Sequence, residues 1–206
     1  MRMRGQAPLV ALTLLAGVAS PVFAQSFPAG TAKNANGMLV VVRADGVESR
    51  LQGRGALQVF EGDTLRMDGE GQALVETEEG AQVALNRGAV VKVLTRWEKG
   101  KGVTRILRLQ CGEVWARNND GQSLLEIETP VGVLAARAAE VSVRLVSDNE
   151  AVATVVQGAA DLSTSLSSCQ LRAGTRSHGH RGKPCSTPAA AEVASVTGWS
   201  HPLLVP

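Results

Sequence analysis

Short apolar runs, interrupted by Gly, Asp and Asn, follow one another from Gly37 to about Thr175. Along LLEIET at 124–129, Leu125 and Ile127 fall on one face and the two glutamates on the other. This two-residue alternation is typical of a half-buried strand. After the first residues, no window shows a convincing apolar period of 3.6 residues, which a surface helix would need. The pattern predicts an all-β domain.

Fourteen segments are predicted strands. They are Met38–Arg43, Ala56–Phe60, Thr64–Met67, Gln72–Thr77, Gln82–Leu85, Val90–Trp97, Val103–Leu109, Gly112–Arg117, Leu124–Thr129, Gly132–Ala136, Glu140–Val146, Ala151–Val156, Ala160–Thr164 and Cys169–Arg172. Short strands at such close spacing favour a compact stack, either a β-sandwich or a β-roll. With three Trp, three Phe and no Tyr, the core must be built mainly from Val, Leu and Ala.

The composition changes near Arg176, where Ser, Ala, Gly and Pro become frequent and alternation stops. We therefore expect a β domain over 37–175 and, over 176–206, a stapled loop followed by a flexible tail. Trp199 and Leu203–Val205 would either dock the tail on the sheet or form a short peptide ligand. The sequence does not choose between these two roles.

The N-terminus has the layout of a secretory signal peptide. Arg2 and Arg4 precede an apolar run from Ala7 to Val18, and Val22–Ala24 closes the segment. We expect export to the periplasm or beyond, with removal of residues 1–24. An uncleaved anchor is the alternative, but an apolar run of about a dozen residues is shorter than the roughly 20 that span a bilayer. No later run approaches that length, so no membrane span is expected after cleavage.

The charge balance argues against nucleic acid as a partner. The formal charge of +2 falls to zero once Arg2 and Arg4 are removed. A neutral chain with mixed charges has no global field that would attract nucleic acid or an anionic membrane.

Three cysteines, Cys111, Cys169 and Cys185, follow the predicted cleavage point. In an exported chain, Cys169 and Cys185 are expected to form a disulfide. These two cysteines with His178 and His180 are also a possible zinc or copper ligand set. Oxidation would remove both thiolates, so the disulfide is favoured. Cys111 is expected to be a buried free thiol because its neighbours are apolar.

The acidic stretch Asp68–Gly71 is a candidate calcium loop, a candidate catalytic acid pair or a turn. Both flanks have strand character, whereas a helix–loop–helix calcium site needs helices. We therefore expect a tight connection in which Gly supplies positive φ.

No catalytic site is expected. Nucleophilic serines need a positioned base, and the three histidines, His178, His180 and His201, lie in the predicted loop and tail. No catalytic residue, cofactor or bound metal is predicted. The basic run Arg96–Lys101 could contact acidic glycans, but basic side chains also protect exposed strand edges.

The order of the turns resembles that of the FecR domain family. The pieces that carry the resemblance, from about Ala56 to Thr175, are Glu61–Leu65, Gly71–Val75, Gly80–Leu85, Leu109–Trp115, Ile127–Gly132, Val155–Gly158 and Leu171–Thr175. The family-like turn positions are Gly62, Asp63, Gly80, Gly112, Thr129, Pro130, Gly132, Gly158 and Gly174. One turn departs from the pattern, because Ala138 and Ala139 replace its usual Gly and Thr, and Val141 replaces an aromatic residue.

The resemblance implies a role in signalling without enzymatic activity. The best-known members of the family control a sigma factor through a short cytoplasmic part and receive a signal in the periplasm from an outer-membrane iron-siderophore transporter. Here no cytoplasmic segment beyond Met1–Arg4 is expected ahead of the apolar run, so the cytoplasmic role is not expected. We expect a domain that binds or scaffolds a protein of the cell envelope. A polysaccharide-binding module is the alternative, although few aromatic residues are present to stack on sugar rings.

We predict that export removes Met1–Ala24. N-terminal sequencing of the protein from a periplasmic fraction should begin at Gln25. Recovery of the intact N-terminus from membranes would contradict the prediction.

Overall fold

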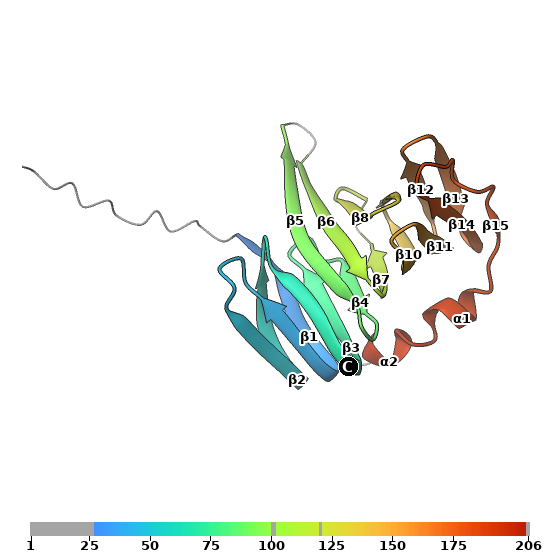
Figure 1. Ribbon diagram of the computed structural model, residues 1–206. Helices are drawn as coiled ribbons and strands as arrows, with labels where there is room; N and C mark the ends of the chain where they lie inside the picture. Colours follow the sequence, from blue (N-terminus) through green and yellow to red (C-terminus); the bar gives the residue numbers. More distant parts are fainter. Residues whose placement is uncertain (1–26, 100–101, 120, 205–206) are drawn as a thin grey trace, which may run out of the picture.

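A computed structural model describes residues 27–99, 102–119 and 121–204 (Figure 1). The expected signal peptide at 1–24 lies outside these residues. The described part contains fifteen strands and two short helices, which confirms the all-β prediction. None of its helices is long and apolar enough to cross a membrane.

The strands are β1 (Pro28–Val42), β2 (Glu48–Phe60), β3 (Thr64–Thr77), β4 (Gln82–Leu85), β5 (Val90–Glu98), β6 (Gly102–Cys111), β7 (Glu113–Asn118), β8 (Leu124–Thr129), β9 (Gly132–Ala136), β10 (Ala139–Ser147), β11 (Glu150–Gln157), β12 (Ala159–Thr164), β13 (Ser168–Arg172), β14 (Thr175–His180) and β15 (Ala189–Ala190). The helices are α1 (Val193–Thr197) and α2 (His201–Leu204). From β4 to β13 the strands coincide with the predicted ones to within two residues. Two-residue alternation therefore located these strands well.

The stretch Asp68–Gly71 is part of β3, so the predicted tight connection is wrong, whereas the expected positive φ occurs at Gly69, at +72°. The strand bends there instead. Gly37 of β1 lies opposite this stretch, where the register of β1 and β3 shifts. A Cβ on Gly37, whose φ is +105°, would lie 2.5 Å from the Cα of Gly71. Glycines that permit a turn also permit two backbones to pack closely at a bulge.

The bend divides the sheet into two arms. One edge of β3 pairs with β1 along its length, while its other edge pairs first with β5 and then with β4. One arm continues as β5-β6-β8-β9-β12-β13 and the other as β4-β7-β10-β11-β14-β15. Side chains from both arms, Leu109, Ile127 and Leu134 on one and Val114 and Val155 on the other, belong to one buried hydrophobic cluster.

The chain crosses between the arms at corners with left-handed backbone. Gly112 and Gly158 have φ values of +81° and +80°, and a Cβ on either would lie 2.7 Å from a backbone atom of Ala89 or Ala138. Ala138, at the corner between β9 and β10, has φ of +44° and is the only non-glycine residue with positive φ in the described part. The left-handed corner is therefore kept although its glycine is lost.

The C-terminal segment differs from the expected irregular tail. Residues 175–180 form β14, which pairs with β11, and the segment then returns so that α2 lies beside β3 (Figure 1). Leu203 is buried and packs with Leu74, Ala84 and Trp115 on the outside of the sheet. The C-terminal segment thus docks on the sheet.

The two expectations about cysteine have different outcomes. A disulfide joins Cys169 on β13 to Cys185, with 6.5 Å between their Cα atoms. The prediction that Cys111 is buried is wrong, because this thiol is exposed. Cys111 ends β6 at a register shift opposite Val90, and the corner at Gly112 follows, so it does not continue the inward alternation of Leu109.

We predict that Ala138→Gly raises the free energy of unfolding by about 1 kcal/mol, because a left-handed backbone costs an L-residue more than it costs glycine. Chemical denaturation would measure the change. Ala139→Gly is the matched control. Ala139 is the first residue of β10 and is buried, so its replacement by glycine should destabilise the protein. A loss of stability in Ala138→Gly would contradict the prediction.

Candidate functional site

The outer face of β10, β11 and β14 carries a ladder of polar side chains. Alternation turns Val141 and Val155 into the core, and it turns Ser142 and Thr154 to the other face. Ser142 lies opposite Thr154, and Thr154 lies opposite Arg176 on β14. Two residues further along β10, Arg144 pairs with Glu113 of β7 on one side and with Val152 of β11 on the other. Strand pairing thus gathers polar residues from four strands.

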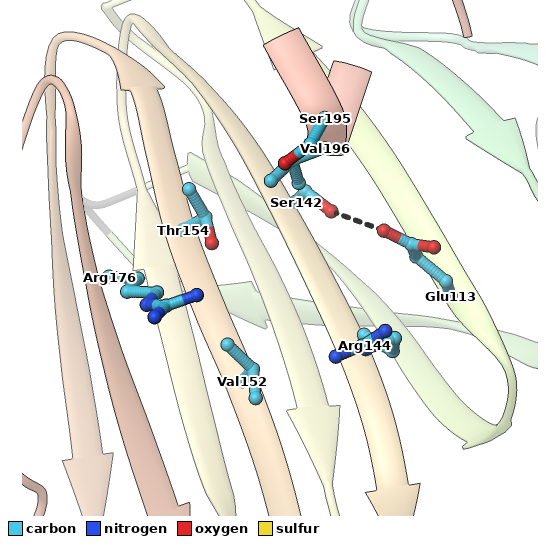
Figure 2. Close-up of a pocket in the computed structure, with 8 residues that line it drawn as sticks. All are labelled: Glu113, Ser142, Arg144, Val152, Thr154, Arg176, Ser195 and Val196. Carbon is cyan, nitrogen blue, oxygen red and sulfur yellow. Dashed lines mark hydrogen bonds between the residues drawn. The ribbon is translucent and has the colours of Figure 1, made fainter. Parts of the chain in front are cut away.

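These residues line a pocket of about 160 Å³ whose wall is completed by Ser195 and Val196 of α1 (Figure 2). The Glu113 carboxylate accepts hydrogen bonds from the Ser142 hydroxyl at 3.1 Å and from the Asn86 amide at 3.0 Å. The pocket is smaller than typical sites for drug-sized ligands. It has room for a single side chain or a small anion.

Arg144 and Arg176 supply the positive charge of this pocket. Within the described residues, neither guanidinium forms a side-chain hydrogen bond or ion pair. Other arginines are neutralised: Arg105, almost fully buried, makes two hydrogen bonds to Glu79, and Arg117 makes two to Glu140. The two pocket arginines are therefore available to an anionic group from another molecule.

The pocket adjoins a buried polar network. Trp115 is fully buried and donates its indole N–H to Glu140 at 2.9 Å. The Arg117 guanidinium lies 5.1 Å from the centre of the Trp115 ring. Glu140 is itself buried, and these bonds satisfy its carboxylate. This network joins β7 to β10 under the docked C-terminal segment.

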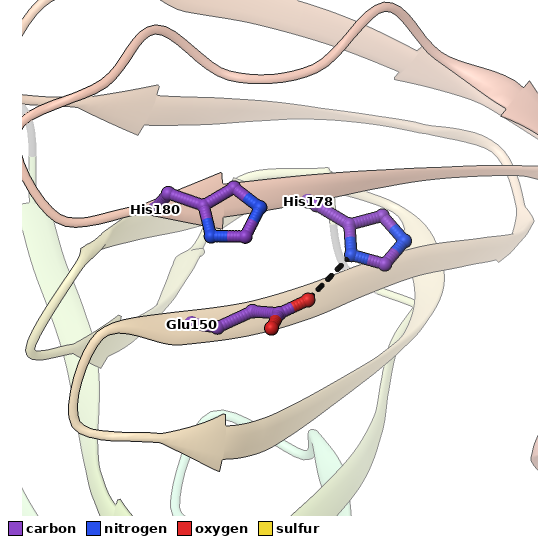
Figure 3. Close-up of side chains that lie close together, drawn as sticks. All are labelled: Glu150, His178 and His180. Atoms are coloured by element: carbon purple, nitrogen blue, oxygen red, sulfur yellow. Dashed lines mark hydrogen bonds and ion pairs between the residues drawn. The ribbon is translucent and has the colours of Figure 1, made fainter.

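A second cluster lies further along the same face, where Glu150, His178 and His180 meet (Figure 3). The ring nitrogen Nδ1 of His178 is 2.9 Å from the Glu150 carboxylate. This hydrogen bond is the main reason why the pKa of Glu150 is lowered, with partial desolvation opposing it and the charges of His180, His178 and Arg144 adding to it. The disulfide excludes the cysteine thiolates that sequence reasoning had grouped with the two histidines.

The family-like turn residues do not converge on one site. Asp63 is buried, pairs with Arg43 and accepts a hydrogen bond from the backbone N–H of Phe60. At the Thr-Pro turn, the Thr129 hydroxyl accepts a hydrogen bond from the backbone N–H of Gly132, and a Cβ on Gly132 would lie 2.4 Å from the carbonyl oxygen of Ser163. Gly62, Gly80 and Gly174 have positive φ. These positions shape the backbone at separate turns.

Arg96 of the basic run singled out in the sequence, and Arg108 on the neighbouring strand β6, form ion pairs with glutamates. Arg96 pairs with Glu126 and Glu98, and Arg108 pairs with Glu128 across β6 and β8. These arginines are thus neutralised by neighbouring strands.

The pocket arginines and Glu150 were not found from the sequence. The sequence pattern showed that these side chains point outward from their strands. The order of the strands in the sheet decides which outward side chains lie next to each other. Glu150 and His178, for example, are 28 residues apart.

The fold is all-β, with one large sheet, and solved structures share this fold. Two crystal structures of a candidate anti-sigma factor from Parabacteroides distasonis ATCC 8503 superpose with a TM-score of 0.57 and 16% identity. The match covers 66% of this chain and 64% or 63% of that protein. This chain thus spans less than two thirds of its neighbour, and the likeness concerns the fold.

The sequence comparison finds one family model. Residues 63–161 match the model described as FecR protein, so this part of the chain is a FecR domain. The match covers the centre of the segment that carries the sequence resemblance. No curated protein is similar to the chain at a significant level.

We predict that His178→Ala raises the pKa of Glu150 toward its ordinary value, because the hydrogen bond to His178 favours the ionised carboxylate. A ¹³C NMR titration of the Glu150 carboxyl group would measure this, with His201→Ala as control. The pKa is lower in the folded state, so the interaction stabilises the fold above the unfolded-chain pKa. That stabilisation is lost as pH falls through the folded-state pKa. An unchanged pKa in His178→Ala would refute the assignment.

Proposed function

We propose that the protein is an exported signalling domain that binds another protein of the cell envelope. The FecR match and the likeness to a candidate anti-sigma factor both support a regulatory role. The observation that carries the proposal is the pair of arginines, Arg144 and Arg176, that line the pocket without a side-chain partner in the described residues. The partner presents an acidic side chain or a chain-terminal carboxylate to them.

The dimensions of the pocket favour a peptide group. A volume of about 160 Å³ admits one carboxylate side chain, and planar guanidinium groups bind carboxylates through paired hydrogen bonds. Hydrogen bonds to charged groups contribute roughly 1.5–3 kcal/mol each. Two such contacts would support recognition of a partner, with the surrounding strands supplying the remaining contact area.

The pocket chemistry supports recognition over catalysis. Of its two serines, Ser142 donates to the Glu113 carboxylate and Ser195 donates to the backbone carbonyl of Glu192. A nucleophilic serine needs a base that is itself held in position for proton transfer. The pair of Ser142 and Glu113 is better suited to fixing the wall of the pocket.

Polysaccharide binding remains the second candidate because of one observation. Trp97, near the tip of the β5–β6 hairpin, is 70% exposed. Exposed aromatic rings stack on sugars. This position is separate from the pocket, so variants can distinguish the two functions.

We predict that Arg144→Glu combined with Arg176→Glu weakens partner capture at least about tenfold, because each lost charge-assisted contact is of the order of 1.5 kcal/mol or more. The measurement is crosslinking in envelope extracts, with mass spectrometry to identify and quantify the captured protein. Arg87→Glu is the control, because Arg87 is exposed and does not line the pocket.

Equal capture by the double variant and by Arg87→Glu would reject the pocket as the binding surface. Retention on a cell-wall glycan column that is lost in Trp97→Ala, without capture of a protein, would establish the polysaccharide alternative.

A further inference from the structure

The segment His178-Gly179-His180 presents two imidazoles on the same face of β14. Alternation explains the glycine between them, because a Cβ on Gly179 would point inward, 3.3 Å from Val131 and 3.8 Å from Thr164. Both histidines therefore point outward. On the neighbouring strand, Glu150 lies directly opposite His180, and Val152 lies opposite His178. Strand pairing places one carboxylate beside two imidazoles.

The three side chains are close enough to share one ion. One ligand atom from each residue lies within 4.8 Å of the other two. Four-coordinate zinc, with bonds of about 2.0–2.1 Å, requires ligand atoms roughly 3.4 Å apart. The side chains of Glu150 and His178 are 31% and 38% exposed, so small rotations can close this difference. The His178 and His180 rings already lie nearly parallel, 6.2 Å apart.

The backbone under the cluster is held in place. His178 donates its backbone N–H to the Ser186 hydroxyl at 2.9 Å, and its carbonyl accepts from the Ser186 N–H at 2.9 Å. Ser186 follows Cys185, which the disulfide ties to Cys169 on β13. On the other side, the Arg181 N–H donates to the Asn149 carbonyl, next to Glu150. These bonds fix the Cα positions from which the ligands extend.

We propose that Glu150, His178 and His180 form a binding site for one divalent transition-metal ion of the zinc, nickel and copper class. Two imidazole nitrogens and one carboxylate oxygen are ligands that these ions share. The ion takes the place of the proton between His178 and Glu150. Three protein ligands leave at least one coordination position to water or to a group of another molecule.

Neighbouring charges and protonation of the ligands both affect the affinity of the cluster for a cation. Glu150 supplies the negative charge, whereas the guanidinium of Arg144 is close enough to affect the Glu150 titration and opposes a cation. Protonation of either imidazole removes a ligand. Binding therefore weakens as the pH falls and protons compete with the ion for the ligand atoms. The site does not depend on the proposed partner binding, since none of its three residues lines the pocket.

The test is isothermal titration of the full chain with zinc chloride. The chain carries no polyhistidine tag, its disulfide is oxidised, and the exposed thiol of Cys111 is alkylated so that it cannot bind zinc. We expect one zinc ion per chain. His178→Ala, His180→Ala and Glu150→Gln should each weaken binding at least about tenfold, the lower range for perturbing groups around a metal.

The matched control is His201→Ala, which removes the third histidine of the chain and should bind zinc as the unaltered protein does. Far-ultraviolet circular dichroism checks that each variant is folded. Visible absorption after cobalt(II) addition gives a second readout, because a nitrogen and oxygen site absorbs without the intense thiolate band near the ultraviolet.

Two results would overturn the proposal. One is no zinc binding in the micromolar range. The other is binding that is unchanged in folded His178→Ala and His180→Ala.

Discussion

The close approach of β1 and β3 at Gly37 and Gly71 is the constraint on which the architecture depends. A side chain on Gly37 would lie 2.5 Å from the backbone of Gly71, so the two strands can bend together only if both positions lack a Cβ. The bend lets a single strand, β3, pair with β5 over its first part and with β4 over its second. Two arms then leave β3 and enclose a core made largely of Val, Leu and Ala. If β3 were straight, a single strand could pair along its whole second edge, and the sheet would not divide at this point.

Besides the bend in β3, the arrangement of the two arms depends on corners with left-handed backbone. Gly112, Ala138 and Gly158 turn the chain from one arm to the other, and backbone of the neighbouring segment approaches Gly112 and Gly158 too closely for a side chain. As a result, β7, β10, β11 and β14 become neighbours although turns and other strands separate them in the sequence. The polar outer face is a consequence of this order. Its residues are ordinary outward positions of separate strands, and only the crossing pattern makes them adjacent.

In the part of the chain that the structure describes, buried charged side chains form ion pairs, whereas two arginines on the polar outer face do not. Asp63 with Arg43, Glu79 with Arg105 and Glu140 with Arg117 are pairs in which at least one member is almost fully buried. An unpaired charge in such places would cost several kcal/mol. On the outer face, Arg144 and Arg176 have water as their alternative partner, so the fold does not require them to be paired. Surface charges that are not paired within the fold are available for recognition, and this contrast is the physical basis for proposing a partner at the pocket.

The sequence by itself determined the strands from β4 to β13, because the alternation that buries one face is a local property of the chain. It also contained the resemblance to FecR proteins. It did not distinguish a bend from a turn at Asp68–Gly71, because glycine serves both and the pairing partner decides which forms. Nor did it reveal that the corner at Ala138 keeps its left-handed backbone, which the packed strands on both sides impose. The meeting of Glu150 with His178 and His180, and of Arg144 with Arg176 around one pocket, was decided only by tertiary structure. Alternation along a strand determines which side of the sheet a side chain faces, whereas the order of the strands determines which other side chains lie beside it.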